Sequence, residues 1–335
     1  MRVLYLYFPG PMRSRTVRVS IYFYGGLKDH CDLIVFGPRA GSPWISRNYK
    51  VFPYQEDMQL QDVISETEAD VVLFGGIRSF NYFYKQLKTN IPKVLLLNEY
   101  ISLKEKVRQN VKKMAGFFDL SITRVRPNTR DYGIPAIWLP FSASDEFYTE
   151  WSSDYLDKRN KRIVYRGTTR GQYPYIVRRN AISILEESGL LAGAKVSKRN
   201  KKKYSVRIHN YPRDLKLYVG GLSCAWSDWG ETPLKTFEIM ASGTCLLTQQ
   251  FNSIVRRELF DNRDDIYVTY KDNCKDIIKK AEGILYNMDK TKEITKNALD
   301  LINKNHLDKH RMKELYDILE ALVRGKEIPR RWRYE

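Results

Sequence analysis

A lysine and a glutamate stand three positions apart in the segment ETPLKTFEIMASGTCLLTQQ, residues 231–250. Good helix formers follow Pro233 and predict a helix that begins near it, so Lys235 lies in the first turn and shares a face with Glu238. The free N–H groups and partial positive charge of a helix N-terminus bind anions, and Lys235 would strengthen such a site. Glu238, one turn deeper, could accept two hydrogen bonds from a vicinal diol such as that of a ribose. The alternative is an ordinary ion pair within the helix.

A second anion-binding pattern occurs in YRGTTRGQYPYIVRR, residues 165–179. A predicted strand ends there at Gly167, two threonines and Arg170 follow, and Arg178 lies on the next predicted helix. Backbone N–H groups beside a glycine, with the Thr168 hydroxyl and an arginine, can cradle a phosphate at the carboxyl end of a strand, where α/β sheets bind ligands. Two such patterns in one half of the chain favour a site for a phosphorylated ligand.

Short apolar runs indicate the sheets that must hold these motifs. Runs of four to six β-branched and large apolar residues that end in Gly, Pro or polar residues are typical of strands buried on both faces of a parallel sheet. The first half of the chain is therefore predicted to be a Rossmann-type α/β domain. Its predicted strands lie in residues 3–8, 31–37, 70–76 and 93–99.

A change of composition marks the expected domain boundary. A short strand is predicted at residues 137–141, and the polar, charged stretch after it predicts a hinge near residues 145–160. The α/β pattern then restarts at residue 161, and a length of 335 residues is typical of two domains. We expect an N-terminal domain over 1–150, a C-terminal domain over 151–320, and a segment 321–335 that packs back on the first domain.

The order of these motifs resembles the nucleotide-sugar-binding domain of GT-B glycosyltransferases. The Gly-Thr-Thr-Arg loop, the segment SDWGETPLKTFEIMASGTCLLT and the charged tail HLDKHRMKELYDIL are similar to the family with the E-x7-E signature and to its spore-maturation-protein branch. Order, spacing and length resemble most closely the DNA β-glucosyltransferases of T-even bacteriophages, with their basic-x-x-Glu-x-Met-Ala-Ser core. The resemblance implies an α/β protein of the GT-B fold, in which two Rossmann-like domains face each other across a cleft.

The resemblance also implies a site for a nucleotide sugar, with a UDP-sugar as the expected donor. Carried over position by position, it assigns Lys235 and Arg170 to the diphosphate. Gly167 and Thr168 would form the loop around the diphosphate, and Glu238 would bind the ribose. The donor is a co-substrate, so no tightly bound cofactor is expected.

One position departs from the family pattern. Glu231 precedes Glu238 by seven positions instead of eight, and Gly230 stands where the family has its first glutamate. That glutamate normally touches the donor sugar, and Asp228 could serve the sugar here instead. Arg178 is a further candidate phosphate ligand, although the loop before it is longer here than in the family. The departure leaves open whether transfer inverts or retains the configuration of the sugar.

Sugar transfer by single displacement needs a carboxylate that takes the proton of the acceptor hydroxyl. Glu99 ends the predicted strand 93–99, at the carboxyl edge where a two-domain cleft would lie, and a similar position in the phage enzymes carries an aspartate. The alternative is that Glu99 caps its loop or pairs with Lys104. No Asp-x-Asp motif appears, so no motif requires a divalent metal, and Arg170, Lys235 and the helix end would balance the diphosphate charge.

The formal net charge of +18 favours a polyanionic partner. DNA, an acidic membrane surface or an anionic substrate would fit, as would a solvated basic surface. The phage resemblance makes 5-hydroxymethylcytosine in duplex DNA the leading acceptor. The alternatives are a cell-surface or virion glycan or a protein hydroxyl, with peripheral membrane contact, and a nucleotide-sugar sensor without catalysis. The candidate DNA-binding arginines are Arg13, Arg15, Arg18, Arg124, Arg126 and Arg130.

Other sequence features indicate the cellular compartment in which we expect the protein. The apolar runs are too short for a transmembrane segment, and the first run breaks at Pro9, unlike a secretion signal. The four cysteines lack the close spacing of metal or redox motifs. We therefore expect a cytoplasmic protein, in the host cytoplasm if a phage encodes it. His306 and His310 have i, i+4 spacing without the glutamate of a zinc-hydrolase helix, so we expect them on a solvated helix face.

Overall fold

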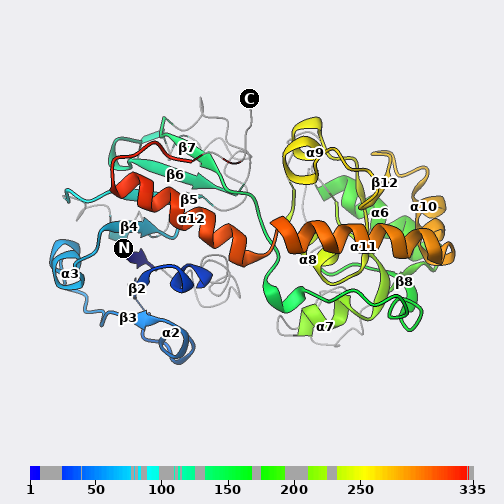
Figure 1. Ribbon diagram of the computed structural model, residues 1–335, viewed down its shortest axis with the longest axis horizontal. Coiled ribbons are helices and arrows are strands. Elements are labelled where there is room, and N and C mark those ends of the chain that lie inside the picture. Colours follow the sequence, from blue (N-terminus) through cyan, green and yellow to red (C-terminus); the bar gives the residue numbers. More distant parts are fainter. Residues whose placement is uncertain are drawn as a thin grey trace. The chain divides into compact units, whose positions relative to one another are not determined.

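The computed structural model divides the chain into two compact units (Figure 1). Unit 1 consists of Met1–Pro140 and Asp308–Glu335, and unit 2 of Phe141–Leu307. The divisions follow residues 140 and 307, whereas the domain ranges expected from the sequence end at residues 150 and 320. The structure describes residues 1–7, 25–38, 40–76, 79, 82–83, 89–97, 109, 112–113, 115–124, 133–167, 175–192, 210–224, 232–329 and 331.

Unit 1 is built around a seven-stranded sheet whose paired strands are all parallel. Its strands are β1 (Arg2–Leu6), β2 (Asp32–Phe36), β3 (Lys50–Val51), β4 (Val71–Phe74), β5 (Lys93–Leu97), β6 (Leu120–Thr123) and β7 (Ala136–Trp138). The order β3-β2-β1-β4-β5-β6-β7 grows outward from β1 to one side and then to the other, as in a doubly wound Rossmann domain. The four predicted strands of the first half coincide with β1, β2, β4 and β5, and their interiors are buried.

One helix of unit 1 shows how a narrow apolar face packs on this sheet. In α3 (Leu60–Thr67) the buried residues follow the i, i+3, i+4, i+7 spacing of an amphipathic helix and join the core beneath it. The other helices described in unit 1 are η1 (Gly25–Asp29), α2 (Pro43–Asn48), η4 (Ala115–Phe117) and α12 (Asp308–Val323). A Cβ on Gly26 of η1 would lie 3.1 Å from Met312 Cγ of α12, so these two elements are in close contact. The chain thus returns to unit 1 at Asp308 rather than at residue 321.

Unit 2 contains a second parallel sheet, of five strands in the order β12-β11-β10-β8-β9. The strands are β8 (Asn160–Val164), β9 (Leu191–Ala192), β10 (Tyr218–Leu222), β11 (Cys245–Gln249) and β12 (Val268–Tyr270). The helices described in this unit are η6 (Asp145–Phe147), α6 (Tyr175–Glu187), α7 (Tyr211–Leu215), α8 (Leu234–Ala241), α9 (Ser253–Phe260), α10 (Ile277–Tyr286) and α11 (Met288–Asn305).

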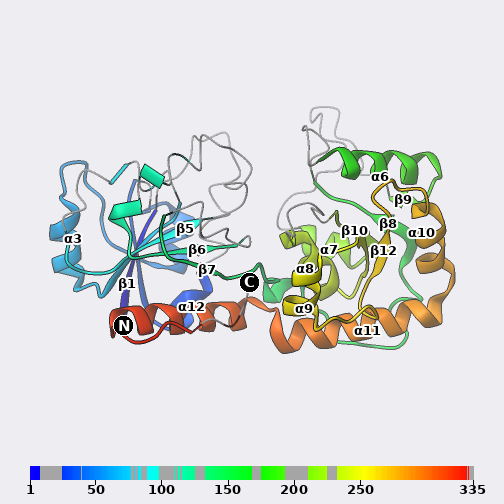
Figure 2. The same cartoon turned by 90° about the horizontal axis from the view of Figure 1, so that it is seen from above.

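Two adjacent glycines show that helices cover both faces of the unit 2 sheet. A Cβ on Gly220 would lie 3.1 Å from Ile284 of α10, and a Cβ on Gly221 would lie 2.8 Å from Ile239 of α8. Successive residues of a strand point to opposite faces, so α10 and α8 lie on opposite sides of β10. Figure 2 likewise shows α6 and α11 on opposite sides of this sheet. The predicted class, two Rossmann-like α/β domains, is confirmed.

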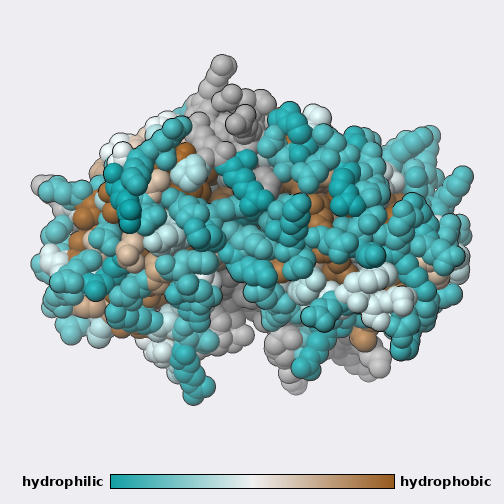
Figure 3. All heavy atoms as spheres, viewed as in Figure 1, coloured by the Kyte–Doolittle hydropathy of each residue, from teal (hydrophilic) through white to brown (hydrophobic). Residues whose placement is uncertain are grey.

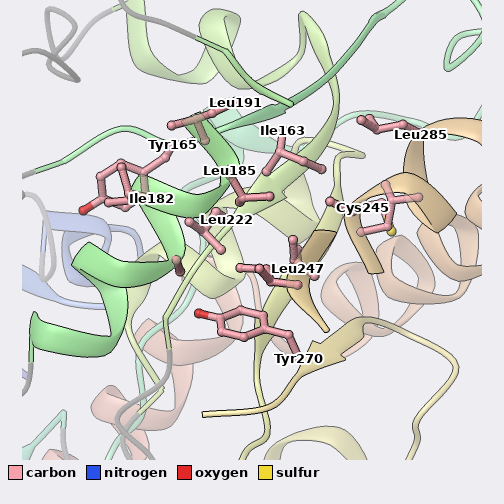
Figure 4. Close-up of a cluster of buried hydrophobic side chains, with 14 of the residues drawn as sticks. Ile163, Tyr165, Ile182, Leu185, Leu191, Leu222, Cys245, Leu247, Tyr270 and Leu285 are labelled. Atoms are coloured by element: carbon pink, nitrogen blue, oxygen red, sulfur yellow. The ribbon is translucent and has the colours of Figure 1, made fainter. Parts of the chain in front are cut away.

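The core on the α6 and α10 side consists of aliphatic residues with two tyrosines at its margin (Figure 4). Tyr165 and Tyr270 are each at most 2% exposed, and each lies at the carboxyl end of its strand or just beyond it. The carboxyl ends of all strands of a parallel sheet lie along one edge, so polar side-chain groups at these ends lie near one another.

The structure corrects the prediction for the histidine pair. α11 ends at Asn305, and His306 is 1% exposed with its Nε2 atom 2.8 Å from the carbonyl oxygen of Leu259. Its ring also packs against Phe237 and Phe260 at centroid distances of 5.2 and 6.4 Å. His306 is therefore a core residue after the helix end, because its ring packs against aromatic side chains and its polar atom has a backbone partner.

The exposed surface of both units is polar. Hydrophilic side chains cover most of the face of each unit in Figure 3. Large apolar side chains that the structure places at the surface of unit 2 are Leu217, Ile278 and Tyr286. No helix among the described residues is long and apolar enough to cross a membrane.

Arg159 satisfies the carboxyl end of α8. Its guanidinium donates to the carbonyl oxygens of Ser242 and Gly243 at 3.0 and 2.9 Å, and to Thr244 Oγ1 at 3.0 Å. Burial lowers the pKa of this guanidinium to about 10, so its charge is held by carbonyl dipoles and by the ring of Tyr155, 4.4 Å away. The last carbonyl groups of a helix need such donors, and α8 receives them from a residue outside the helix.

We predict that Arg159→Ala destabilises unit 2 by about 2–4 kcal/mol, because it removes charged hydrogen bonds to half-buried carbonyl groups. The neighbouring Lys158→Ala is the matched control, since Lys158 is exposed and pairs only with the exposed Asp154 among its described contacts. Its expected effect is small, because an exposed ion pair contributes little to stability. Urea unfolding of the two variants measures the difference, and equal stabilities would show that Arg159 does not hold the end of α8.

Candidate functional site

The N-terminus of α8 is fixed to the sheet but carries no side-chain cap within the described part of the chain. Pro233 is the N-cap residue, with φ −62° and ψ 146°, and its side chain makes no capping hydrogen bond. Behind it, the Thr236 hydroxyl lies 3.2 Å from the Ser223 hydroxyl, which follows β10. This contact anchors the first turn of α8 at the carboxyl edge of the sheet. A helix N-terminus held at this edge is the kind of place that binds anions.

Lys235 extends from the first turn of α8 into an aromatic corner. Its Nζ atom lies 5.0 Å from the ring centroid of Tyr211 and 5.9 Å from that of Tyr165. It also donates a hydrogen bond of 3.3 Å to the Tyr211 hydroxyl. Two aromatic faces and a hydroxyl thus hold the ammonium group at one place on the carboxyl edge of the sheet.

Glu238 is a buried carboxylate one turn deeper in α8. It is 7% exposed, and the Tyr211 hydroxyl forms a hydrogen bond with it. Burial raises the pKa of Tyr211 well above its ordinary value, and the charge of Glu238 and the shared hydrogen bond raise it further. Tyr211 therefore stays protonated at neutral pH and serves Glu238 as a hydrogen-bond donor.

Gly167 forms the turn after β8 and lies against Lys235. Its φ of +152° belongs to the region that favours glycine. A Cβ there would lie 2.8 Å from the Tyr165 hydroxyl and 3.6 Å from Lys235 Cε. The preceding residue, Arg166, is 4% exposed and pairs with Asp214 of α7 through Nε at 2.6 Å. The turn is therefore shaped by a glycine and held by a buried ion pair.

Arg178 lies in the first turns of α6 and contacts a second polar group at the same edge. It forms a hydrogen bond with Cys224, whose Sγ atom also lies 3.2 Å from the Tyr270 hydroxyl. Burial raises the pKa of the Cys224 thiol, and the charge of Arg178 opposes that rise. Arg178 is thus half-buried beside the ends of β10 and β12.

The structure brings Gly167, Lys235 and Glu238 together, as the two sequence motifs predicted, and places Arg178 on the same sheet edge. Tyr165, Tyr211 and Ser223 were not predicted. Tyr165 could have been found from its position two residues before Gly167, but Tyr211 comes from a separate helix and carried no motif. The other candidate residues lie outside the described residues: Arg13, Arg15, Arg18, Glu99, Arg126, Arg130, Thr168, Arg170 and Asp228.

Arg124 is a correction to the predicted DNA-binding set. Its side chain is 3% exposed, and its guanidinium donates to the carbonyl oxygens of Leu139 and Pro140 at 3.4 and 3.1 Å. It follows β6 and ties that strand to the segment after β7. A guanidinium buried in this way cannot reach a phosphate at the surface.

No group of three or more His, Cys, Asp or Glu side chains within the described ranges could hold a metal ion. The four cysteines, all within those ranges, are free thiols. Among the described residues, the charged groups of the site on unit 2 include those of Lys235, Glu238 and Arg178. They can bind an anion and a hydroxyl-bearing group side by side.

Comparison of the sequence with known families identifies part of the chain. A family model described as glycosyl transferase-like matches residues 196–317, a range that includes α7, α8 and α11. No curated protein matches the sequence. The matched range contains Tyr211, Lys235 and Glu238.

Comparison with solved structures identifies the fold of the whole chain. Anabaena HepE in complex with UDP and glucose aligns with a TM-score of 0.65 at 10% identity, over 96% of this chain and 100% of that chain. An alpha-glucosyltransferase in complex with UDP and a 13-mer DNA aligns with a TM-score of 0.64 at 11% identity, over 96% and 100%. A glycosyltransferase from Rickettsia africae aligns with a TM-score of 0.61 at 12% identity, over 97% and 99%.

These similarities define the class of protein. The chain has the GT-B fold that the motifs predicted, and the resemblance to glycosyltransferases is confirmed. The family match supports the predicted enzyme class, a nucleotide-sugar-dependent glycosyltransferase. The DNA-bound structure named above is an alpha-glucosyltransferase, whereas the sequence motifs had pointed to the β-glucosyltransferases.

We predict that Gly167→Ala lowers the free energy of unfolding by about 1–3 kcal/mol, because the backbone there disfavours a side chain and the added methyl group would meet the Tyr165 hydroxyl. Gly283→Ala is the control, since Gly283 lies inside α10 with nothing within 4 Å of its added Cβ. The control is expected to be neutral or stabilising by up to about 1 kcal/mol. Thermal unfolding of both variants tests the turn, and a neutral Gly167→Ala would contradict it.

Proposed function

We propose that the protein is a glycosyltransferase that moves a sugar from a UDP-sugar to an acceptor hydroxyl, with its donor site on unit 2. The observation that carries the proposal is the meeting of Lys235 and Glu238 on one face of α8, beside the turn at Gly167. The family match over residues 196–317 supports it. So does the presence of UDP in two structures of the same fold, those of HepE and the alpha-glucosyltransferase.

The diphosphate of the donor would lie at the N-terminus of α8. The leading N–H groups of the helix and the ammonium of Lys235 would balance its charge. Gly167 would let the backbone approach the phosphates closely, and Thr168 and Arg170 would complete the loop, as the motif indicates. Arg178, at the start of α6, is the remaining candidate for a phosphate contact.

Glu238 would bind the ribose of the donor. A carboxylate can accept a pair of hydrogen bonds from two neighbouring hydroxyl groups, such as those at the 2′ and 3′ positions of a ribose. Each charged hydrogen bond of this kind contributes about 1.5–3 kcal/mol. A 2′-deoxyribose could form only one of the two.

The transfer itself forms one bond and breaks another. The oxygen of the acceptor hydroxyl bonds to the anomeric carbon of the sugar, the bond from that carbon to the diphosphate oxygen breaks, and the nucleotide leaves as its diphosphate. In a single displacement the proton of the hydroxyl passes to a carboxylate, for which Glu99 is our candidate general base. The positive groups at α8 would stabilise the charge that develops on the leaving diphosphate. Asp228 is the candidate contact to the sugar.

For the acceptor we propose 5-hydroxymethylcytosine in duplex DNA. The net charge of +18 and the DNA in the alpha-glucosyltransferase structure support this choice. An enzyme that acts on a base in a duplex must hold the phosphate backbone and extrude the nucleotide, which needs basic side chains around the acceptor. Without Arg124, the candidates are Arg13, Arg15, Arg18, Arg126 and Arg130.

HepE, which has the same fold, was solved in complex with UDP and glucose. A glycan or a protein hydroxyl is therefore the second candidate acceptor, with the basic surface at a membrane. A protein that only binds the nucleotide sugar is the third, and it would not need a carboxylate at the acceptor.

The donor site predicts how nucleotide affinity responds to substitution. Lys235→Ala and Glu238→Ala should each weaken UDP binding about tenfold or more, since each removes a charged hydrogen-bonding partner. Wild-type protein should prefer UDP to 2′-deoxy-UDP, and Glu238→Ala should lose most of that preference. Calorimetry measures all five affinities.

The matched controls are Lys279→Ala and Glu282→Ala, an exposed lysine and glutamate with the same i, i+3 spacing on α10. They should leave UDP affinity unchanged. Folded Lys235 and Glu238 variants with wild-type affinity would place the donor elsewhere.

The acceptor proposal predicts sugar transfer to DNA that contains 5-hydroxymethylcytosine and none to unmodified DNA. Binding to duplex DNA should weaken with salt, with a log–log slope of about −0.9 for each phosphate neutralised. Glu99→Gln should keep DNA and UDP binding but lower kcat by about 100-fold to 10,000-fold. Release of UDP and mass spectrometry of the DNA report the transfer.

Three outcomes would each contradict a different part of this proposal. Transfer to a glycan or a protein without transfer to DNA would favour the second candidate. UDP-sugar binding without transfer to any acceptor would favour a sensor. Wild-type turnover in Glu99→Gln would remove Glu99 from the reaction and favour a mechanism that retains the sugar configuration.

A further inference from the structure

Tyr211 begins α7 and is held in one orientation by its neighbours. Its ring packs edge-on against Phe147, with a centroid distance of 5.5 Å and an interplanar angle of 76°. Pro212 follows it, and a proline in the first turn fixes the backbone at the start of the short helix. The phenol ring therefore has little freedom to turn, and its hydroxyl points to a defined place.

At that place the hydroxyl contacts both charged side chains of α8. It accepts a hydrogen bond of 3.3 Å from Lys235 Nζ and forms one with the Glu238 carboxylate. A hydroxyl that accepts from a cation becomes a stronger donor to an anion, so the two bonds support each other. Through Tyr211, the position of the ammonium group and that of the carboxylate depend on one another.

The carboxylate needs this donor because it is buried. A carboxyl group that is 7% exposed loses most of its hydration and must be hydrogen-bonded within the protein. The Tyr211 hydroxyl supplies one hydrogen bond from a fixed direction. It thereby determines which oxygen lone pairs of Glu238 face a ligand and which face the protein.

The helix that carries Tyr211 is fixed at three other points. Asp214, one turn along α7, pairs with the buried Arg166 next to Gly167. The carbonyl oxygen of Leu215 accepts a hydrogen bond of 3.0 Å from Thr244 Oγ1, beyond the end of α8. Lys216 Nζ donates to the carbonyl oxygen of Tyr148 at 2.9 Å. α7 thus connects the turn after β8 with α8, and Tyr211 is part of this connection.

We propose that Tyr211 is a positioning residue, which sets Lys235 and Glu238 for the diphosphate and the ribose of the donor through its hydroxyl. This inference rests on the proposed function of the site. Tyr211 acts through the two side chains of α8 and takes no part in the transfer of the sugar.

The test compares Tyr211→Phe with wild type, because phenylalanine keeps the packing on Phe147 and removes only the hydroxyl. We expect UDP to bind about 5- to 20-fold more weakly to this variant. The preference for UDP over 2′-deoxy-UDP should also fall, because Glu238 loses its fixed orientation. That ratio of two affinities does not depend on the fraction of folded protein, so it stays informative if the variant is less stable.

Tyr267→Phe is the matched control. Tyr267 is a buried tyrosine of the same unit that packs on Phe251 and Phe260, away from the site. It should keep both the UDP affinity and the preference for the ribose. A loss of equal size in Tyr267→Phe would show that any buried hydroxyl of unit 2 has this effect, and it would overturn the proposal.

A double-mutant cycle separates a positioning role from a general structural one. If Tyr211 acts partly through Glu238, Tyr211→Phe should weaken UDP binding by a smaller factor in a Glu238→Ala background than in wild type. Fully multiplicative effects, or a Tyr211→Phe variant with wild-type affinity and ribose preference, would overturn the inference.

Failure of the proposed function gives a different result. Wild-type protein that does not bind UDP would contradict the donor site, and the cycle would then be measured in urea unfolding, to which the Tyr211–Glu238 hydrogen bond contributes without a ligand. Non-additive changes in the unfolding midpoint would support the coupling of Tyr211 and Glu238, and additive changes would overturn it.

Discussion

The two ends of α8 are the constraint on which the unit 2 site depends. A helix exposes unpaired carbonyl groups at one end and unpaired N–H groups at the other. Arg159 satisfies the carbonyl end, whereas the end at Pro233 has no side-chain cap among the described contacts. The helix is thereby stabilised at one end and left with binding capacity at the other. Because β10 and the Ser223–Thr236 contact hold that open end at the sheet edge, its direction is fixed.

The short helix α7 explains how two loops at one edge of a parallel sheet are held in a fixed relative position. β8 and β10 are neighbours, but the turn after β8 and the start of α8 are far apart in sequence. Asp214 reaches the first through Arg166, and Tyr211 reaches the second through Lys235 and Glu238. Burying an ion pair or a tyrosine hydroxyl costs free energy unless its partners stay in place. Each of the two contacts therefore limits the movement of the groups that form the other.

The fold and the site carry different amounts of functional information. Proteins that share this fold at 10–12% identity include one described with glucose and one described with DNA. The donor site that we propose on unit 2 rests on a charged pair on one helix, whereas the choice of acceptor depends on loops that vary within a fold. The burial of Arg124 illustrates this limit, because a basic cluster in the sequence does not tell which of its members reach the surface.

The sequence alone determined the two parallel sheets and the Lys235–Glu238 pair, because strand burial and helix spacing are local and repeat with fixed periods. The turn at Gly167 could also be predicted from the sequence, because a turn that needs an unusual φ selects glycine. Tertiary structure alone decided the environment of those residues. Tyr211 lies in a different element and has no local pattern that marks it, and the burial of His306 and Arg124 depends on aromatic rings and carbonyl groups brought from elsewhere in the chain. A sequence encodes which side chains are near along the chain, whereas hydrogen bonds between elements depend on how those elements pack.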